Sequence, residues 1–216
     1  MPILSVASTK GGVSKTTLVV SLADWWRRQG RTVTCLDMDP NKNLLSWIGE
    51  ADLPGLIVRP ITEDDVFDEA TDAAQCSDIV IVDVAGVLSR GMLLAFGASD
   101  AVLIPSGTSY GDIFEAGRTQ AQVRNAIKAA CKHNPEADIL HAVALTKVNR
   151  RAAVTQASRQ QLAEFEIPVL DSDLPARTAY QQAWFRSCSP MDVGEPSVAS
   201  DIEAIAHDIG EHLGIR

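Results

Sequence analysis

Short apolar runs alternate along the chain with longer segments in which apolar residues recur every three or four positions. The short runs predict strands at 3–7, 32–37, 79–83, 101–105, 140–146 and 167–170, with a weaker candidate at 56–59. The longer segments predict helices at 15–29, 62–75, 112–132, 151–165 and 198–213. Strands that alternate with helices favour parallel βαβ units, and nearly all-apolar strands favour a sheet covered on both faces. We therefore expect an α/β fold with a mostly parallel, twisted sheet and helices on both faces.

Length and composition favour a single domain for residues 1–216. The 216 residues are 46% hydrophobic and 22% charged, as in globular proteins. The clearest break is the loop 187–197, which contains Pro190, Gly194 and Pro196. We expect this loop to lead into a C-terminal packing helix at about 198–213 and not into a second domain.

The spacing of the cysteines and the hydropathy of the chain indicate the cellular compartment in which the protein is expected. Cys35, Cys76, Cys131 and Cys188 have neither metal-ligand nor redox spacing, so free thiols are expected. The chain shows no signal-peptide pattern and no apolar stretch long enough for a bilayer. A cytoplasmic protein that does not enter membranes is the expectation.

The strongest chemical signal is the segment 8–17, Ser-Thr-Lys-Gly-Gly-Val-Ser-Lys-Thr-Thr, between the first strand and the first helix. Backbone N–H groups and a helix N-terminus bind phosphate in this context. Gly11 and Gly12 allow close approach of the backbone, Lys15 suits the β- and γ-phosphates, and the Thr16 hydroxyl suits Mg²⁺. The alternative is a glycine turn with exposed lysines.

The segment departs from the standard phosphate-loop pattern, because Thr9 and Ser14 stand where glycines are expected. With Lys10 before the paired glycines, Lys-Gly-Gly-x-x-Lys-Thr-Thr resembles the deviant Walker A motif of the ParA/MinD ATPases. The resemblance implies a single-domain P-loop NTPase fold and an ATP-sandwiched homodimer. Within it, Lys15 acts on its own nucleotide and Lys10 reaches the partner's nucleotide.

Carboxylates follow two of the predicted strands. Asp37 and Asp39 stand in Asp-Met-Asp-Pro-Asn, similar to the family's Asp-x-Asp-Pro segment, although Asn41 replaces the usual glutamine. The resemblance implies that Asp39 positions the attacking water and that Asp37 supports Mg²⁺. An Asp-Pro turn followed by a helix cap is the alternative. The apolar run 79–82 ends in Asp83, the Walker B form, which implies a second Mg²⁺ ligand beside Thr16, or a capping aspartate instead.

The resemblance extends from residue 3 to about residue 183. The Gly86 N–H is expected to sense the γ-phosphate, and Thr146 and Pro175 are loosely matched to adenine contacts. The candidate nucleotide-binding residues are Gly11, Gly12, Val13, Ser14, Lys15, Thr16, Thr17, Gly86, Thr146 and Pro175. The chain is most similar to the small, ParF-like ParA class, because the first strand begins at residue 3 and leaves no DNA-reading extension.

Members of this class dimerise with ATP, bind DNA without sequence preference and hydrolyse ATP slowly until a ParB-like or ParG-like partner stimulates them. The resemblance implies these properties here, with ATP/ADP and Mg²⁺ as cofactors, plasmid or chromosomal DNA as cargo, and a nucleoid-associated location. The alternatives are a MinD-like membrane or cargo-positioning ATPase, or a metabolic enzyme on the same scaffold. The acidic polar side of the last predicted helix argues against anionic lipid.

Basic residues are concentrated in one part of an acidic chain. The net charge is −9, yet residues 118–186 carry ten Lys and Arg against six Asp and Glu. Such residues suit DNA phosphates through salt-sensitive, sequence-independent contacts. We expect DNA binding by Lys147, Arg150 and Arg151, with a helical stripe at Arg124, Lys128 and Lys132 as a second candidate. Solvated faces are the alternative for both groups.

Overall fold

The computed structural model describes residues 1–51, 53–132, 134–212 and 214–215. Within these residues, seven strands form one parallel sheet in the order β3-β2-β4-β1-β5-β6-β7. The strands are β1 (Ile3–Val6), β2 (Val33–Asp37), β3 (Leu56–Pro60), β4 (Ile79–Asp83), β5 (Ala101–Ser106), β6 (Leu140–Val148) and β7 (Val169–Pro175). The expected α/β fold with a parallel sheet is confirmed.

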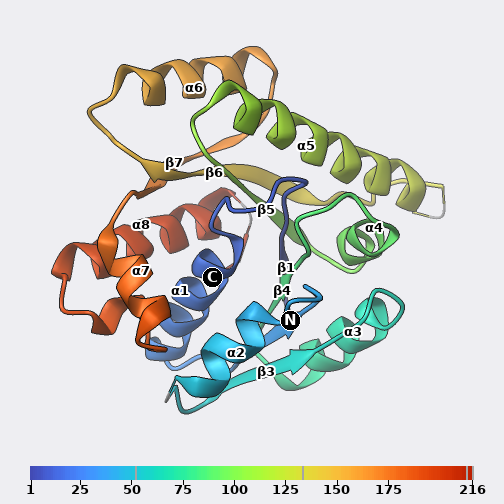
Figure 1. The fold of residues 1–216 in the computed structure, drawn as a ribbon. Helices are drawn as coiled ribbons and strands as arrows, with labels where there is room; N and C mark the ends of the chain where they lie inside the picture. The colour runs from blue at the N-terminus through green and yellow to red at the C-terminus, as the bar shows by residue number, and fades with distance from the viewer. Residues whose placement is uncertain (52, 133, 213, 216) are drawn as a thin grey trace.

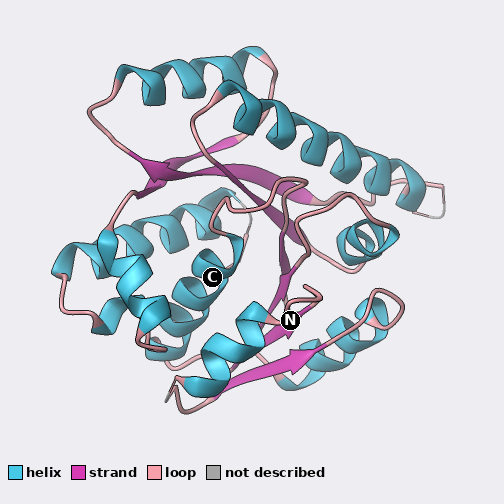
Figure 2. Cartoon of the chain, in the orientation of Figure 1, coloured by secondary structure: helices cyan, strands magenta, loops and turns pink. Residues whose placement is uncertain are grey.

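Helices cover both faces of the sheet (Figures 1 and 2). One face carries α1 (Lys15–Arg28), α2 (Asn43–Glu50), α7 (Thr178–Phe185) and α8 (Pro196–His212). The other carries α3 (Val66–Cys76), α4 (Arg90–Gly97), α5 (Tyr110–Ala130) and α6 (Ala153–Glu164). A short 3₁₀ helix, Pro190–Asp192, lies before α8.

The central strands divide their side chains between two core layers. In β4, Ile79 and Ile81 pack with the α1 and α8 layer, whereas Val80 and Val82 pack with the α3 to α6 layer. All four are fully buried, and each contributes about 1.5–3 kcal/mol through loss of apolar surface from water. Burial on both faces explains why the residues of β4 before Asp83 are all apolar.

The strand order places chemistry at one edge of the sheet. β1 lies in the centre, between β4 and β5, and residues Val6 and Asp37 both pair in register with Asp83. The chain moves to one side of β1 through β2 and β3, and to the other side through β5, β6 and β7. Ligands of open α/β sheets bind at the carboxyl ends of the strands where this direction changes.

The structure adds helices to the predicted elements and extends some strands, β7 the furthest. The helices α2, α4 and α7 were not predicted, and each has only eight residues, which is about two turns of periodicity. β7 continues through polar residues to Pro175, beyond the predicted end at residue 170. As an edge strand paired only with β6, β7 has no need of a continuous apolar sequence.

The apolar side of α8 packs inside the protein. Val198, Ile202, Ile205 and Ile209 are fully buried in the core layer shared with α1. Leu213, which was expected on the same side, lies outside the described residues. Among the helices described, we find none with the length and apolarity that a bilayer crossing requires.

Candidate nucleotide-binding site

The phosphate loop joins the end of β1 to the start of α1 at Lys15. Two of its residues have left-handed backbone, with φ of 75° at Gly12 and 68° at Ser14. Gly12 adopts this conformation without steric cost, whereas Ser14 does so at a cost of about 1 kcal/mol. The serine at the expected glycine position therefore keeps the glycine-like backbone.

A cavity of about 1000 Å³ opens beside this loop, at the upper end of the size range of ligand pockets. Its walls come from the phosphate loop, the β2 and β4 ends, and the segment from β7 into α7. The candidate residues that line it are Gly11, Gly12, Ser14, Lys15, Thr16, Thr17, Asp39, Gly86, Lys147 and Pro175. The loop and these strand ends therefore share one hollow large enough for a nucleotide.

Lys15 carries a largely buried positive charge at the floor of this hollow. Its side chain is only 8% exposed, and burial lowers the pKa of its ammonium, although Asp83 and Asp39 oppose the shift. Gly86 lies directly against it, since a Cβ added there would stand 2.8 Å from the Lys15 Nζ and 3.3 Å from the Gly11 Cα. Only glycine fits at position 86 without displacing the loop.

Asp83 and Thr16 meet behind the loop. The Thr16 hydroxyl donates to Asp83 Oδ2 at 2.7 Å, while the buried Oδ1 has no partner among the described residues. Burial raises the pKa of Asp83 to about 7, against the opposing effects of Thr16 and Lys15. A buried carboxylate oxygen without a partner, next to a hydroxyl, fits Mg²⁺, which is held by one or two carboxylates plus substrate phosphates.

The two carboxylates after β2 have different environments. Asp37 is fully buried, and its two oxygens accept the backbone N–H groups of Asp39 at 3.0 Å and Leu45 at 2.9 Å. It therefore caps the first turn of α2, and it is absent from the cavity lining. Asp39 lines the cavity, and its Oδ1 accepts both the backbone and side-chain N–H of Asn41.

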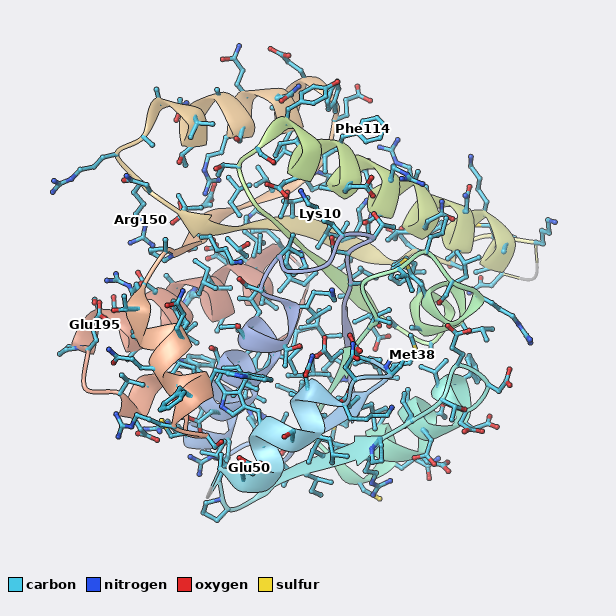
Figure 3. The ribbon with its side chains drawn as sticks, in the orientation of Figure 1. Lys10, Met38, Glu50, Phe114, Arg150 and Glu195 are labelled. Atoms are coloured by element: carbon cyan, nitrogen blue, oxygen red, sulfur yellow. The ribbon has the colours of Figure 1, made fainter. Side chains whose placement is uncertain are left out.

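The beginning of the loop is fixed to α5. Lys10 lies beside α5 (Figure 3). Its ammonium is paired with Asp112, which also completes a capping box with Ser109 at the helix N-terminus. The Thr9 hydroxyl donates to Glu115 Oε2 at 2.6 Å. Lys10 thus lies outside the cavity lining, and the expected partner-directed lysine is engaged within its own chain.

The two candidate adenine contacts occupy different environments. Thr146 is fully buried, and its hydroxyl donates to the carbonyl oxygens of Val13 at 3.1 Å and Ser106 at 3.3 Å. Its side chain supports the loop and is absent from the cavity lining, and the base contact expected from it stays a prediction. Pro175 lines the cavity.

The sequence analysis missed side chains of α7 that share this wall. Arg177, Tyr180 and Trp184 all line the cavity beyond Pro175. Arg177 immediately precedes α7, and the eight residues of this helix are too few for a periodic signal. The wall opposite the phosphate loop is therefore more aromatic than the sequence pattern suggested.

The expected DNA-binding group is divided among different partners. The Lys147 ammonium donates to the Gly12 carbonyl at 2.7 Å, inside the cavity lining. Arg150 is paired with Asp173 at 2.7 Å and Asp201 at 3.0 Å (Figure 3). Arg151 is exposed, and among the described residues it forms no ion pair. A single basic surface made by these three side chains is not what the structure shows.

Known proteins are similar to this chain in sequence. Residues 4–187 match the family described as the CobQ/CobB/MinD/ParA nucleotide binding domain. Protein ParA of Rhizobium radiobacter is 30% identical over 184 residues, which cover 83% of this chain and 81% of that protein. The maintenance of carboxysome distribution protein A of Halothiobacillus neapolitanus is 26% identical over 212 residues, 95% of each chain.

A solved structure agrees at the level of the fold. The cell division ATPase MinD of Pyrococcus furiosus superposes with a TM-score of 0.76 at 16% identity, over 97% of this chain and 98% of that one. The family match includes the phosphate loop, the β2 and β4 carboxylates and the α7 wall of the cavity. From its phosphate loop to its aromatic wall, this chain belongs to the CobQ/CobB/MinD/ParA family of nucleotide-binding domains.

Proposed function

We propose that residues 1–216 act as one ParA-type ATPase domain that binds ATP with Mg²⁺ and hydrolyses it slowly. The observation that carries the proposal is the Thr16–Asp83 pair with its unpartnered oxygen, adjoining a phosphate loop that lines a cavity of about 1000 Å³. ParA/MinD relatives include ATPases, as the name of the P. furiosus protein states.

Residues in different parts of the site have different proposed roles. Lys15 and the loop N–H groups bind the phosphates, and Gly86 leaves space for them beside Lys15. Thr16 and Asp83 would hold Mg²⁺, which neutralises phosphate charge when bound. Asp39, on the cavity wall, orients the attacking water. Asp37 acts indirectly, because it fixes the backbone of Asp39 and the start of α2.

Hydrolysis should be slow in the isolated domain. Asp39 is held by Asn41, and among the described residues the cavity lining contains no histidine or glutamate that could serve as a strong base. We propose that ATP brings two copies together, that Lys10 leaves Asp112 to reach the second nucleotide, and that a ParB-like or ParG-like partner accelerates turnover.

DNA binding is proposed for the dimer, with a revised surface. Arg124, Lys128 and Lys132 recur at four-residue intervals, are exposed, and have no ion-pair partner among the described residues. Together with Arg151 they offer charges that Arg150 and Lys147 cannot offer, because those two are engaged. Sequence-independent attraction to DNA phosphates would give nucleoid association and a steep dependence on salt.

DNA binding by the purified protein with ATP, ADP or no nucleotide, across a salt series, tests this function. Lys10→Ala and Lys15→Ala should abolish ATP-dependent dimerisation and DNA binding. Arg124→Ala/Lys128→Ala/Lys132→Ala should weaken DNA binding while ATP affinity stays unchanged. ATP-driven dimers without DNA affinity would contradict DNA binding but leave the nucleotide site intact.

A second candidate is the positioning of a protein assembly. The match to the carboxysome distribution protein extends over 95% of both chains, more of this chain than the match to ParA covers. Membrane association is less well supported, because the apolar side of α8 is buried against the core. Binding of the protein to DNA but not to anionic liposomes would exclude membrane association. Identification of the cargo then distinguishes DNA partition from the positioning of a protein assembly.

A further inference from the structure

The end of β6 holds the phosphate loop at two consecutive carbonyl groups. Lys147 Nζ donates to the Gly12 carbonyl at 2.7 Å, and the Thr146 hydroxyl donates to the Val13 carbonyl at 3.1 Å. On the other side of the loop, Lys15 Nζ lies 3.4 Å from the Lys10 carbonyl. Adjacent residues of one strand therefore fix adjacent peptides of a loop more than 130 positions away in the sequence.

The backbone of β6 is distorted at the place where this contact is made. Its pairing with β7 shifts register between Thr146 and Val148, and Lys147 has a left-handed φ of 55°. Register irregularities next to binding sites commonly redirect a side chain. Left-handed backbone is unfavourable for a lysine, and such strain persists where the surrounding structure imposes it.

The direction of the Gly12 carbonyl decides the direction of the next N–H. A trans peptide is planar, so its C=O and N–H point in opposite directions. An ammonium that holds the Gly12 oxygen therefore also fixes the Val13 N–H on the opposite side of the peptide. Converging N–H groups form the anion-binding concavity of a phosphate loop.

We propose that Lys147 is a positioning residue of the nucleotide site, which orients the Gly12–Val13 peptide so that its N–H is ready for phosphate. This inference rests on the proposed nucleotide binding and assigns Lys147 a role other than DNA contact. Lys147 lies on the β6 side of the loop, whereas Asp39 follows β2 and Asp83 ends β4 on the other side of β1. Its effect should therefore fall on binding and not on the hydrolysis step.

Lys147→Asn tests the role of the ammonium separately from the backbone. The substitution removes the charge. Because asparagine tolerates the left-handed conformation, the unliganded variant should be as stable as the wild type. We expect the Kd for ADP and the KM for ATP to rise by about tenfold, which is the effect expected from the loss of one charge-assisted hydrogen bond. The kcat at saturating ATP should stay within about twofold, and Lys147→Arg should recover most of the affinity.

Arg151→Asn is the matched control, because it removes one exposed charge from the same segment and should leave the Kd for ADP unchanged. An unchanged Kd for ADP in Lys147→Asn overturns the role of Lys147 but leaves the proposed nucleotide binding intact. So does a fall in kcat without a change in KM, or a loss of DNA affinity at saturating ATP with normal ATP affinity. Lys15→Ala should bind no ADP and serves as the negative control. If the wild-type protein also binds no ADP, both the proposed function and this inference are wrong.

Discussion

Asp83 should make the unliganded protein less stable as the pH rises. Its carboxylate is 1% exposed, with one oxygen bound to Thr16 and the other without a partner among the described residues. Burial raises its pKa from 3.8 to about 7. Between those values the folded protein binds a proton that the unfolded chain has released, so the stability contributed by protonated Asp83 decreases as the pH increases.

The magnitude follows from the shift. Relative to Asp83→Asn, which cannot ionise, the wild type should lose about 2–3 kcal/mol of unfolding free energy between about pH 5 and about pH 8. The asparagine can still accept the hydrogen bond from Thr16, so the comparison isolates the charge. The variant should be the more stable protein at about pH 8, and its advantage should shrink steadily toward about pH 5.

Urea unfolding of both proteins over this pH range, without Mg²⁺ and nucleotide, provides the measurement. Addition of Mg²⁺ and ADP should then stabilise the wild type and have a much smaller effect on Asp83→Asn, because the ionised carboxylate gains a cation. A stability difference that is independent of pH would refute the reasoning, since it would place the ionisation of Asp83 at its ordinary pKa in the folded state.

Three further substitutions test local features of the site. Ser14→Gly should raise the free energy of unfolding by about 0.5–1 kcal/mol, because glycine relieves the left-handed strain, and a lower thermal midpoint would contradict this. Asp37→Ala should cost about 2–3 kcal/mol in urea unfolding, because two N–H groups, including that of Leu45, lose the buried carboxylate that accepts from them. A cost below about 0.5 kcal/mol would exclude the capping role. Thr9→Val should cost about 1 kcal/mol through loss of the bond to Glu115, and equal thermal midpoints would argue that this bond contributes nothing.

Features defined by neighbouring residues were predictable from the sequence. The loop at 8–17 needs only a strand before it and a helix after it, so its position follows from local order, whereas the left-handed backbone at Ser14 is known only from the structure. The strands were equally legible, because burial on both faces makes a strand such as β4 apolar at every position before its final Asp83.

Features that depend on distant contacts were not predictable. Lys147, Arg150 and Arg151 form a basic cluster in sequence. A register shift in β6 turns Lys147 to the Gly12 carbonyl, and the carboxylates of β7 and α8 engage Arg150, which leaves Arg151 without an ion pair among the described residues. The capping role of Asp37 likewise requires α2, whose eight residues are too few to show a helical period. Charge and spacing identify candidate residues, but tertiary packing decides which charges remain available.

The aromatic wall of the cavity gives the protein an intrinsic optical signal. Trp184 is 44% exposed, lines the cavity and packs edge-on against Trp47, with ring centroids 4.8 Å apart. A nucleotide that enters the hollow displaces water from this indole, whereas Trp25 and Trp26 on α1 are outside the cavity lining. Tryptophan emission should therefore follow loading and release in real time without a label, and Trp184→Phe identifies the part of the signal that comes from the site.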